Sequence, residues 1–207
     1  IENVSQVQDK NGEWRPIDSD KDPTVILLHY PSILEDTINY IPPRVKIEIS
    51  CLSMDEPTEL RQIRSLIGES FDGEDRGAES LVRTVVPTRT FLEKLFLLAE
   101  EFQKEKPRSV RMSRHLYDLE KLMDTEYGLE ALSNRKLYDA IVEHRKTYYA
   151  LKYVNYDLHA PSSISFTIPK SVMDAWQDDY ADMRRFFIYG ESLEFDALMQ
   201  KMRELQE

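Results

Sequence analysis

The stretch "SLVRTVVPTRTFLEKLFLLAEEF", residues 80–102, contains the change of residue periodicity that decides the fold. Up to Pro87 its β-branched residues favour an extended chain, which predicts a strand over residues 80–87. Beyond Pro87 the apolar residues recur every three or four positions, which predicts an amphipathic helix over residues 88–106. The predicted apolar stripe consists of Phe91, Leu95, Leu98 and Phe102.

Two threonines are candidates for the N-terminal cap of this helix. Thr90 and Glu93 have the spacing of a capping box, in which each side chain accepts a hydrogen bond from the backbone N–H of the other residue. Thr88, directly after Pro87, competes as the N-cap. Either alternative begins the helix within one turn of Pro87.

Upstream of the quoted stretch, the patterns are mainly those of strands. The run "TVILLHY" (24–30) is continuously apolar and "RVKIEISCL" (44–52) alternates apolar and polar residues, so both predict strands. Residues 8–23 are polar and rich in turn formers, which is typical of a loop or a short hairpin. Apolar residues at helical spacing predict a short helix over residues 55–71. These residues are Leu60, Ile63 and Ile67.

Downstream of the quoted stretch, helical patterns dominate. Apolar residues at helical spacing predict helices over residues 111–128 and 133–152, the first of them ending at Gly128. Residues 154–169 are predicted to form a loop with some extended character, because "SISFTIP" has the composition of a strand. Two closing helices are predicted over residues 170–190 and 191–207.

Strands followed by helices indicate an α+β fold with a boundary near Pro87. Residues 1–87 are expected to form a small sheet domain with one helix. Residues 88–207 are expected to form a mostly helical domain packed on it.

The composition favours a globular protein of a reducing compartment. The chain has 207 residues, of which 41% are hydrophobic, so it can bury a core. Its one cysteine, Cys51, excludes an internal disulfide. No apolar run approaches the roughly 20 residues that span a bilayer, and no segment has the pattern of a signal peptide. We therefore expect a cytoplasmic protein without a membrane partner.

The charge of the chain is negative overall but positive in one segment. The formal net charge is −11, which argues against a protein that coats nucleic acids non-specifically. Residues 104–114 nevertheless contain five Lys or Arg and one Glu. Such a cluster attracts anionic ligands locally. Its arginines are candidates for binding phosphate, since the planar guanidinium matches phosphate oxygens. They are Arg108, Arg111 and Arg114.

Three further residues are candidates for chemistry, each with a simpler structural alternative. Glu48, on the polar face of its strand, is either a ligand of a divalent cation or a solvated side chain. Lys94 lies at the edge of the apolar stripe, where its amine either meets a phosphate or reaches solvent over a buried stem. Asp118 forms an intrahelical pair with Arg114 or orients Lys94. In the second case arginine and His115 would bind phosphate.

Five phrases of the sequence, in order, resemble the AbiEii/AbiGii toxin family of bacterial nucleotidyltransferases. These proteins are the toxins of abortive-infection, type IV toxin–antitoxin systems. The resemblance covers the chain from about residue 40 to its end, and five ordered phrases are a specific signal. The phrases are "YIPPRVKIEIS" (40–50), "VVPTRTFLEKLFLLAEEF" (85–102), "RMSRHLYDLEKLM" (111–123), "LYDAIVEHR" (137–145) and "DDYADMRRFFIYG" (178–190).

The resemblance implies the nucleotidyltransferase fold of polymerase-β-like enzymes, with residues 1–87 as the remainder of the nucleotidyltransferase domain. Such enzymes transfer a nucleotide from a nucleoside triphosphate and release pyrophosphate, with Mg²⁺ ions held by carboxylates. By match, Glu48 lies near the third metal-binding carboxylate, Lys94 holds the triphosphate and Asp118 completes the site. The implied partners are a nucleoside triphosphate, an RNA acceptor such as tRNA, and a cognate antitoxin.

One departure from the family pattern concerns the first metal ligands. The family has a Gly-Gly or Gly-Ser turn followed by Asp-x-Asp, and these 207 residues lack that motif. Because the sequence begins at Ile1, we expect this chain to be an incomplete form with an incomplete Mg²⁺ site, inactive alone. The alternative function is a non-catalytic helical module that uses the basic cluster to dock RNA or an antitoxin.

Overall fold

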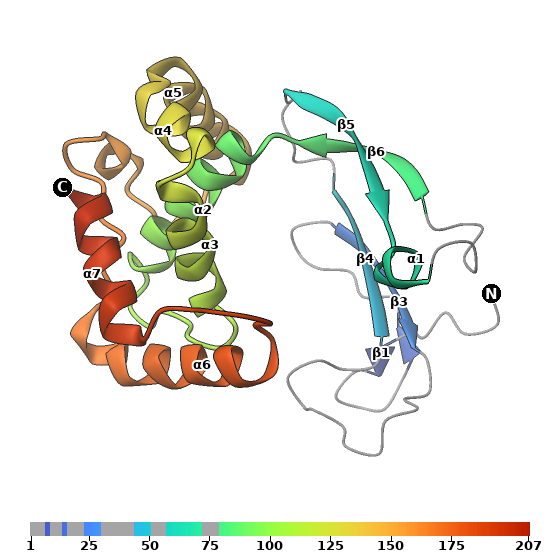
Figure 1. Ribbon diagram of the computed structural model, residues 1–207. Coiled ribbons are helices and arrows are strands. Elements are labelled where there is room, and N and C mark those ends of the chain that lie inside the picture. The colour runs from blue at the N-terminus through green and yellow to red at the C-terminus, as the bar shows by residue number, and fades with distance from the viewer. Residues whose placement is uncertain (1–6, 9–13, 16–22, 30–43, 51–56, 72–78) are drawn as a thin grey trace. The chain divides into compact units, whose positions relative to one another are not determined.

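The computed structural model describes residues 7–8, 14–15, 23–29, 44–50, 57–71 and 79–207 of the chain (Figure 1). For the strands before residue 57 only the backbone is described. By its internal contacts the chain divides into two compact units. One contains residues 1–53 and 182–191, and the other contains residues 54–181 and 192–207.

The first unit contains two antiparallel pairs of strands. The pairs are β1 (Val7–Gln8) with β2 (Trp14–Arg15), and β3 (Pro23–His29) with β4 (Arg44–Ser50). In the second pair Val25 lies opposite Glu48. β3 and β4 confirm the strands predicted from the apolar run and from the alternating pattern, and β1 with β2 has the hairpin character expected of residues 8–23.

The second unit begins with a β-hairpin where the sequence predicts a helix. β5 (Thr58–Arg64) pairs antiparallel with β6 (Glu79–Val85). β6 confirms the strand predicted before Pro87. The helix predicted over residues 55–71 is wrong, except for the single turn of α1 (Leu66–Ser70).

Helical spacing is misleading in this segment because its apolar residues do not form a buried stripe. Leu60 and Ile63 lie on β5 and are 63% and 49% exposed. With so little burial to favour a helix, the regular hydrogen bonds to β6 decide the local structure. Residues 65–78 separate this partner from β5 in the sequence, so local periodicity contains no information about it.

α2 (Pro87–Glu101) begins where the periodicity changes. Proline suits the first helical position, because its φ angle is fixed and its missing N–H has no helical partner there. Val86 is the N-cap, so neither threonine alternative for the cap is correct. The helix ends at Glu101, earlier than predicted, before the polar residues 103–106.

α2 supplies much of the core of the second unit. It contacts α3 (Ser113–Met123), α4 (Glu126–Ser133) and α5 (Arg135–His144), and Figure 1 shows α2 running beside α3. The predicted stripe of α2 is buried from its first residue to Leu98. Side chains without any exposed surface include Phe91, Leu92, Phe96, Leu98, Leu116, Leu119 and Ile141.

Gly128 does not end a helix, contrary to the prediction. α3 ends at Met123, and Gly128 lies in the first turn of α4, where its N–H donates to the Thr125 hydroxyl at 3.3 Å. A Cβ on residue 128 would lie 2.3 Å from the carbonyl oxygen of Leu122. The close approach of α4 to the end of α3 therefore requires glycine.

We expect Gly128→Ala to lower the free energy of unfolding by about 1–3 kcal/mol, because the added methyl group overpacks a contact with backbone that cannot yield. Urea denaturation measures the change. Leu129→Ala, at an exposed position of the same helix, is the control and should alter stability by less than about 0.5 kcal/mol. Equal stability of the two variants would contradict the tight contact.

From α5 to its last residue the chain follows the predicted helices closely. α5 continues into a turn of π-helix, η1 (Arg145–Tyr149), and a short 3₁₀-helix, η2 (Tyr156–His159), follows. Within the predicted loop of residues 154–169, residues 161–163 form a turn and residues 164–169 have no regular secondary structure. Ile164, Phe166 and Ile168 are buried at alternate positions, as in an extended segment. The structure records no strand in this segment. The closing helices are confirmed as η3 (Lys170–Val172), α6 (Met173–Phe186) and α7 (Phe195–Gln206).

The architecture is α+β, as predicted, with small two-stranded sheets followed by helices. The placement of a domain boundary at Pro87 stays a prediction. Within the described part of the chain, no helix has the length and apolar character needed to cross a membrane.

Candidate active site

Lys94 and Asp118 meet between α2 and α3, as the sequence predicts for a shared site. The Lys94 Nζ lies 2.7 Å from Asp118 Oδ2. Burial of the apolar side chains on either side, Leu95 on α2 and Leu119 on α3, holds the two helices together at this point. The two side chains remain 25% and 36% exposed, so an anion in solvent can approach the pair. Their catalytic role stays a prediction.

His115 is a third member of this group, one turn before Asp118 on α3. Its Nδ1 lies 3.3 Å from the Lys94 Nζ, and its residue surface is only 5% exposed. Burial, together with the charges of Lys94, Arg114 and Arg108, lowers the pKa of His115 to about 3. A buried and neutral imidazole does not suit the phosphate-binding role considered for His115 from the sequence, since that role needs a cation.

Arg114, which precedes His115 on α3, is exposed. Within the described residues Asp118 forms its ion pair with Lys94 and not with Arg114, so the intrahelical alternative for Asp118 is wrong. Arg114 instead contributes positive charge next to His115 from the solvent side. Its binding of phosphate stays a prediction, and its exposure next to His115 is compatible with it.

Arg108 balances a local acid. Its Nε and Nη2 donate to Glu101 Oε2 at 3.1 and 2.9 Å, and its backbone N–H donates to Glu101 Oε1 at 2.7 Å. Lys104 Nζ adds a further contact of 2.7 Å to the same carboxylate, which is 3% exposed. A phosphate at Arg108 would therefore have to compete with a buried carboxylate.

Arg111 belongs to the turn that begins α3. Its φ angle of 58° lies in the left-handed region, and its backbone N–H donates to Asp179 Oδ1. Asp179 Oδ2 accepts from the N–H of Ser113 at 3.0 Å and from its hydroxyl. A carboxylate from α6 thus caps the N-terminus of α3, where helices favour negative charge. This cap fixes the helix that carries His115 and Asp118.

Glu48, the predicted metal ligand, lies in β4, but its side chain lies outside what the structure describes. Among the residues that are described, no group of three or more His, Cys, Asp or Glu side chains is arranged to hold a metal ion. The proposed Mg²⁺ site therefore stays a prediction that depends on Glu48.

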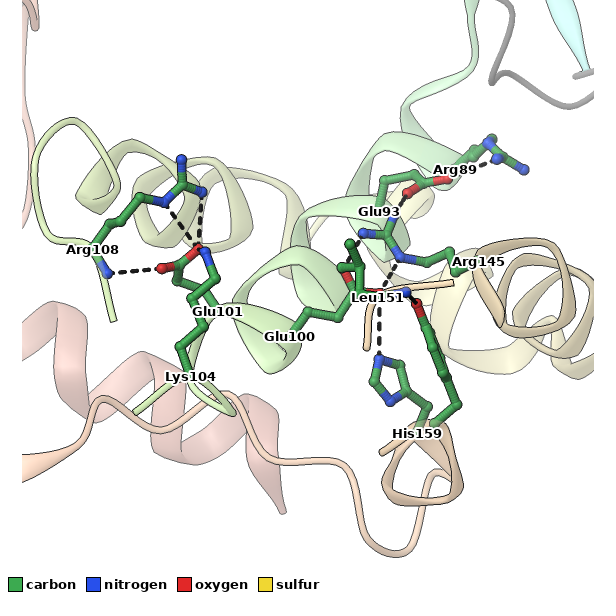
Figure 2. A network of polar contacts seen from close by, with 10 residues as sticks. Arg89, Glu93, Glu100, Glu101, Lys104, Arg108, Arg145, Leu151 and His159 are labelled. Atoms are coloured by element: carbon green, nitrogen blue, oxygen red, sulfur yellow. Dashed lines mark hydrogen bonds and ion pairs between the residues drawn. The ribbon is translucent and has the colours of Figure 1, made fainter. Parts of the chain in front are cut away.

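A buried network of charges, which the sequence analysis missed, joins acidic residues of α2 to Arg145 (Figure 2). Arg145 Nε and Nη2 donate to the two oxygens of Glu100 at 2.7 and 2.5 Å, and its Nη1 donates to Glu93. Glu93 also accepts from Arg89 at 2.7 Å, and His159 Nε2 lies 3.7 Å from Glu100. The Arg145 and Glu100 side chains are each 5% exposed.

The spacing of residues along α2 can predict the α2 members of this network but not their partner Arg145. Arg89 and Glu93 are four residues apart, and Glu100 follows after two further turns, so the three share one side of the helix. Charged residues repeated beside an apolar stripe indicate buried pairing. The partner, Arg145, comes from η1, and no spacing rule connects it to α2.

We expect the free energy of unfolding to fall as the pH drops below about 4.5, where the unfolded-state carboxyls begin to protonate. Burial alone would raise the pKa of Glu101, but the hydrogen bonds from Arg108 and Lys104 hold that pKa below its ordinary value of 4.5. A lowered folded-state pKa stabilises the fold above 4.5, and this stabilisation is lost as the pH falls through the folded-state pKa.

The test is urea denaturation between pH 3 and pH 7. Glu101→Gln should make stability depend less steeply on pH in the acid range. Glu105→Gln, at an exposed position of the segment after α2, is the matched control and should keep the wild-type slope. A Glu101→Gln profile parallel to the wild type would show that this carboxylate is not coupled to folding.

The comparison with known proteins identifies one family. A family model described as "Nucleotidyl transferase AbiEii toxin, Type IV TA system" matches residues 2–201 of the chain. This match begins well before residue 40, where the resemblance of the quoted phrases begins. No curated protein and no solved structure matches the chain.

Proposed function

The chain belongs to the AbiEii family of nucleotidyl transferase toxins of type IV toxin–antitoxin systems, and we propose that it transfers a nucleotide from a nucleoside triphosphate to an RNA such as tRNA. An oxygen of the acceptor would attack the α-phosphorus. The bond from that phosphorus to the oxygen bridging to the β-phosphate would break, and pyrophosphate would leave. We place this reaction in the cytoplasm.

The observation that carries the proposal is the ion pair between Lys94 and Asp118 at 2.7 Å. The two residues come from separate phrases of the family resemblance, and they meet across two helices while keeping part of their surface in solvent. A lysine that only covers the core with its stem needs no such partner. In the proposed reaction the Lys94 ammonium binds the triphosphate, and Asp118 holds the ammonium in position.

The function assigned to Lys94 follows from where charge develops. Negative charge increases on the leaving pyrophosphate as the bond to the α-phosphorus breaks, and a fixed cation stabilises that charge more than the starting state. Mg²⁺ is the proposed cofactor, and when bound it would neutralise phosphate charge. Glu48 is the residue of this chain that we assign to it, because carboxylate oxygen is a preferred ligand of hard cations.

The test is a transfer assay with the purified protein in its full natural length. The protein is incubated with Mg²⁺, total bacterial RNA and each of the four nucleoside triphosphates in turn, labelled at the α-phosphate. We expect covalent label in RNA and release of pyrophosphate in equal amount. RNA binding without label from any nucleotide would favour the alternative, a non-catalytic helical module. Because the family belongs to toxin–antitoxin systems, a cognate antitoxin is also a proposed partner.

We expect Arg114→Glu to weaken RNA binding and to reduce the slope of log K against log salt by about one unit, as one phosphate contact is lost. Arg114 is exposed and adds positive charge next to His115. A filter-binding titration over a range of salt concentrations measures both quantities. Arg135→Glu on α5, where the arginine is paired with Asp139 at 2.8 Å, is the matched control and should change neither. An unchanged slope for Arg114→Glu would remove this residue from the RNA interface.

A further inference from the structure

The contact between His115 and Lys94 bears on the tautomer of the imidazole. A lysine ammonium has three N–H donors and no acceptor, so the His115 Nδ1 at 3.3 Å from Nζ must be the acceptor. The imidazole is then neutral and carries its proton on Nε2. Lys94 consequently has two acceptors from α3, the Asp118 carboxylate and the His115 ring.

The charges around His115 agree with this assignment. Lys94 faces it from α2, Arg114 lies next to it on α3, and Arg108 approaches from the segment before α3. Asp118, the carboxylate of the group, is paired with Lys94. Burial and three cations oppose a fourth positive charge and lower the pKa of His115 to about 3. The imidazole therefore stays an acceptor throughout the physiological pH range.

We propose that His115 is a positioning residue of the nucleotidyltransferase reaction, which fixes the direction of the Lys94 ammonium together with Asp118. A single carboxylate leaves a lysine free to rotate about its partner, whereas two acceptors at separate points fix two of its three N–H bonds. The third N–H is left to the triphosphate. This inference rests on the proposed function, since it assigns Lys94 to the triphosphate.

The contact itself is tested by ¹⁵N NMR of the histidine side chains between pH 5 and pH 8. The chain has four histidines, and the signals absent from a His115→Asn sample identify those of His115. We expect His115 to keep the neutral Nε2–H tautomer without titrating over this range. Titration near the ordinary value for histidine, or a proton on Nδ1, would overturn the inference.

The functional consequence is tested with two variants of His115. The side-chain amide of Asn places an acceptor near the position of Nδ1, whereas Leu fills much of the ring's volume without any acceptor. We expect His115→Leu to lose about tenfold or more in kcat/KM for the nucleotide, as for a lost hydrogen bond to a charged group. His115→Asn should retain most of the wild-type value.

Which of the two variants retains the higher kcat/KM distinguishes a positioning role of His115 from a packing role. A residue that only fills space would tolerate Leu better than the smaller and polar Asn, so a folded His115→Leu variant with wild-type kcat/KM would overturn the inference. Circular dichroism and thermal unfolding establish that each variant is folded. If wild-type protein transfers no nucleotide, the proposed function fails, and with it the assigned role of His115. If the wild type is active but His115 titrates normally, the inference alone fails.

Discussion

Lys94→Ala is expected to abolish nucleotide transfer and any toxicity that depends on it. Removing a preorganised group that stabilises transition-state charge typically lowers kcat by about 10²–10³-fold. Asp118 contacts the Lys94 Nζ at 2.7 Å and His115 contacts it at 3.3 Å, so alanine leaves both groups without this partner. The effect should appear in kcat as well as in kcat/KM, because the interaction strengthens as the leaving group gains charge.

The measurement is the transfer assay with labelled nucleotide, accompanied by urea denaturation of the same sample. Lys94 is partly exposed, so its loss should change stability by no more than about 1 kcal/mol. Lys121→Ala is the matched control, because it removes the same charge from α3 at an exposed position where the lysine pairs with Glu120. A folded Lys94→Ala protein with wild-type turnover would exclude this residue from the mechanism.

Asp118 allows a stricter form of this test. If Asp118 acts by holding Lys94, then Asp118→Asn should lower transfer in the wild type and have little further effect in the Lys94→Ala protein. Such non-additivity is expected of residues that act as one unit. Independent, additive losses would show that Asp118 acts on the substrate directly.

The sequence predicts well those features that depend on local patterns. The change of period at Pro87 correctly separates β6 from α2, since strand and helix bury their apolar residues at different intervals. The same reasoning places the closing helices α6 and α7. For the candidate site, the sequence offered the pairing of Lys94 with Asp118 as one of two alternatives for Asp118, and the structure has that one.

The features that the sequence does not predict depend on distant partners. The apolar spacing of β5 predicts a helix, but the pairing of β5 with β6, which follows later in the chain, makes it a strand. Gly128 looks like a helix terminator, whereas the structure requires it for the contact of α4 with the backbone of Leu122. Arg108 looks like a free cation until Glu101 is seen to accept from it. In each case the deciding energy comes from a tertiary contact and not from a local preference.

Arg145→Met is expected to cause the largest loss of stability, about 3–5 kcal/mol, because it leaves the Glu100 carboxylate buried without its cation. Burial alone would raise the pKa of Glu100, but the hydrogen bonds from Arg145, with a smaller contribution from the nearby His159 ring, hold that pKa below its ordinary value. In the variant the carboxylate keeps only His159, with 3.7 Å between Nε2 and Oε1. Such a loss is a large fraction of the roughly 5–15 kcal/mol that stabilises a typical domain.

Urea denaturation of Arg145→Met, Glu100→Gln and the double variant measures the interaction energy between Arg145 and Glu100 separately from the effect of each substitution. Removing both charges should recover much of the stability lost by removing the arginine alone, since the main cost is an unpaired buried charge. Arg135→Met is the control, because that arginine pairs with Asp139 at an exposed position. A loss below about 1 kcal/mol in Arg145→Met would show that water or a local shift of α2 solvates Glu100.

The two large effects should be distinguishable although both residues act through α2. Lys94 faces α3 and the candidate site, whereas Glu100 pairs with Arg145 from η1. Lys94→Ala should therefore give a stable and inactive protein. Arg145→Met should give a protein that loses transfer only to the extent that it unfolds. Activity measured against urea concentration would follow the unfolding curve for Arg145→Met, whereas for Lys94→Ala it would be absent even where the protein is fully folded.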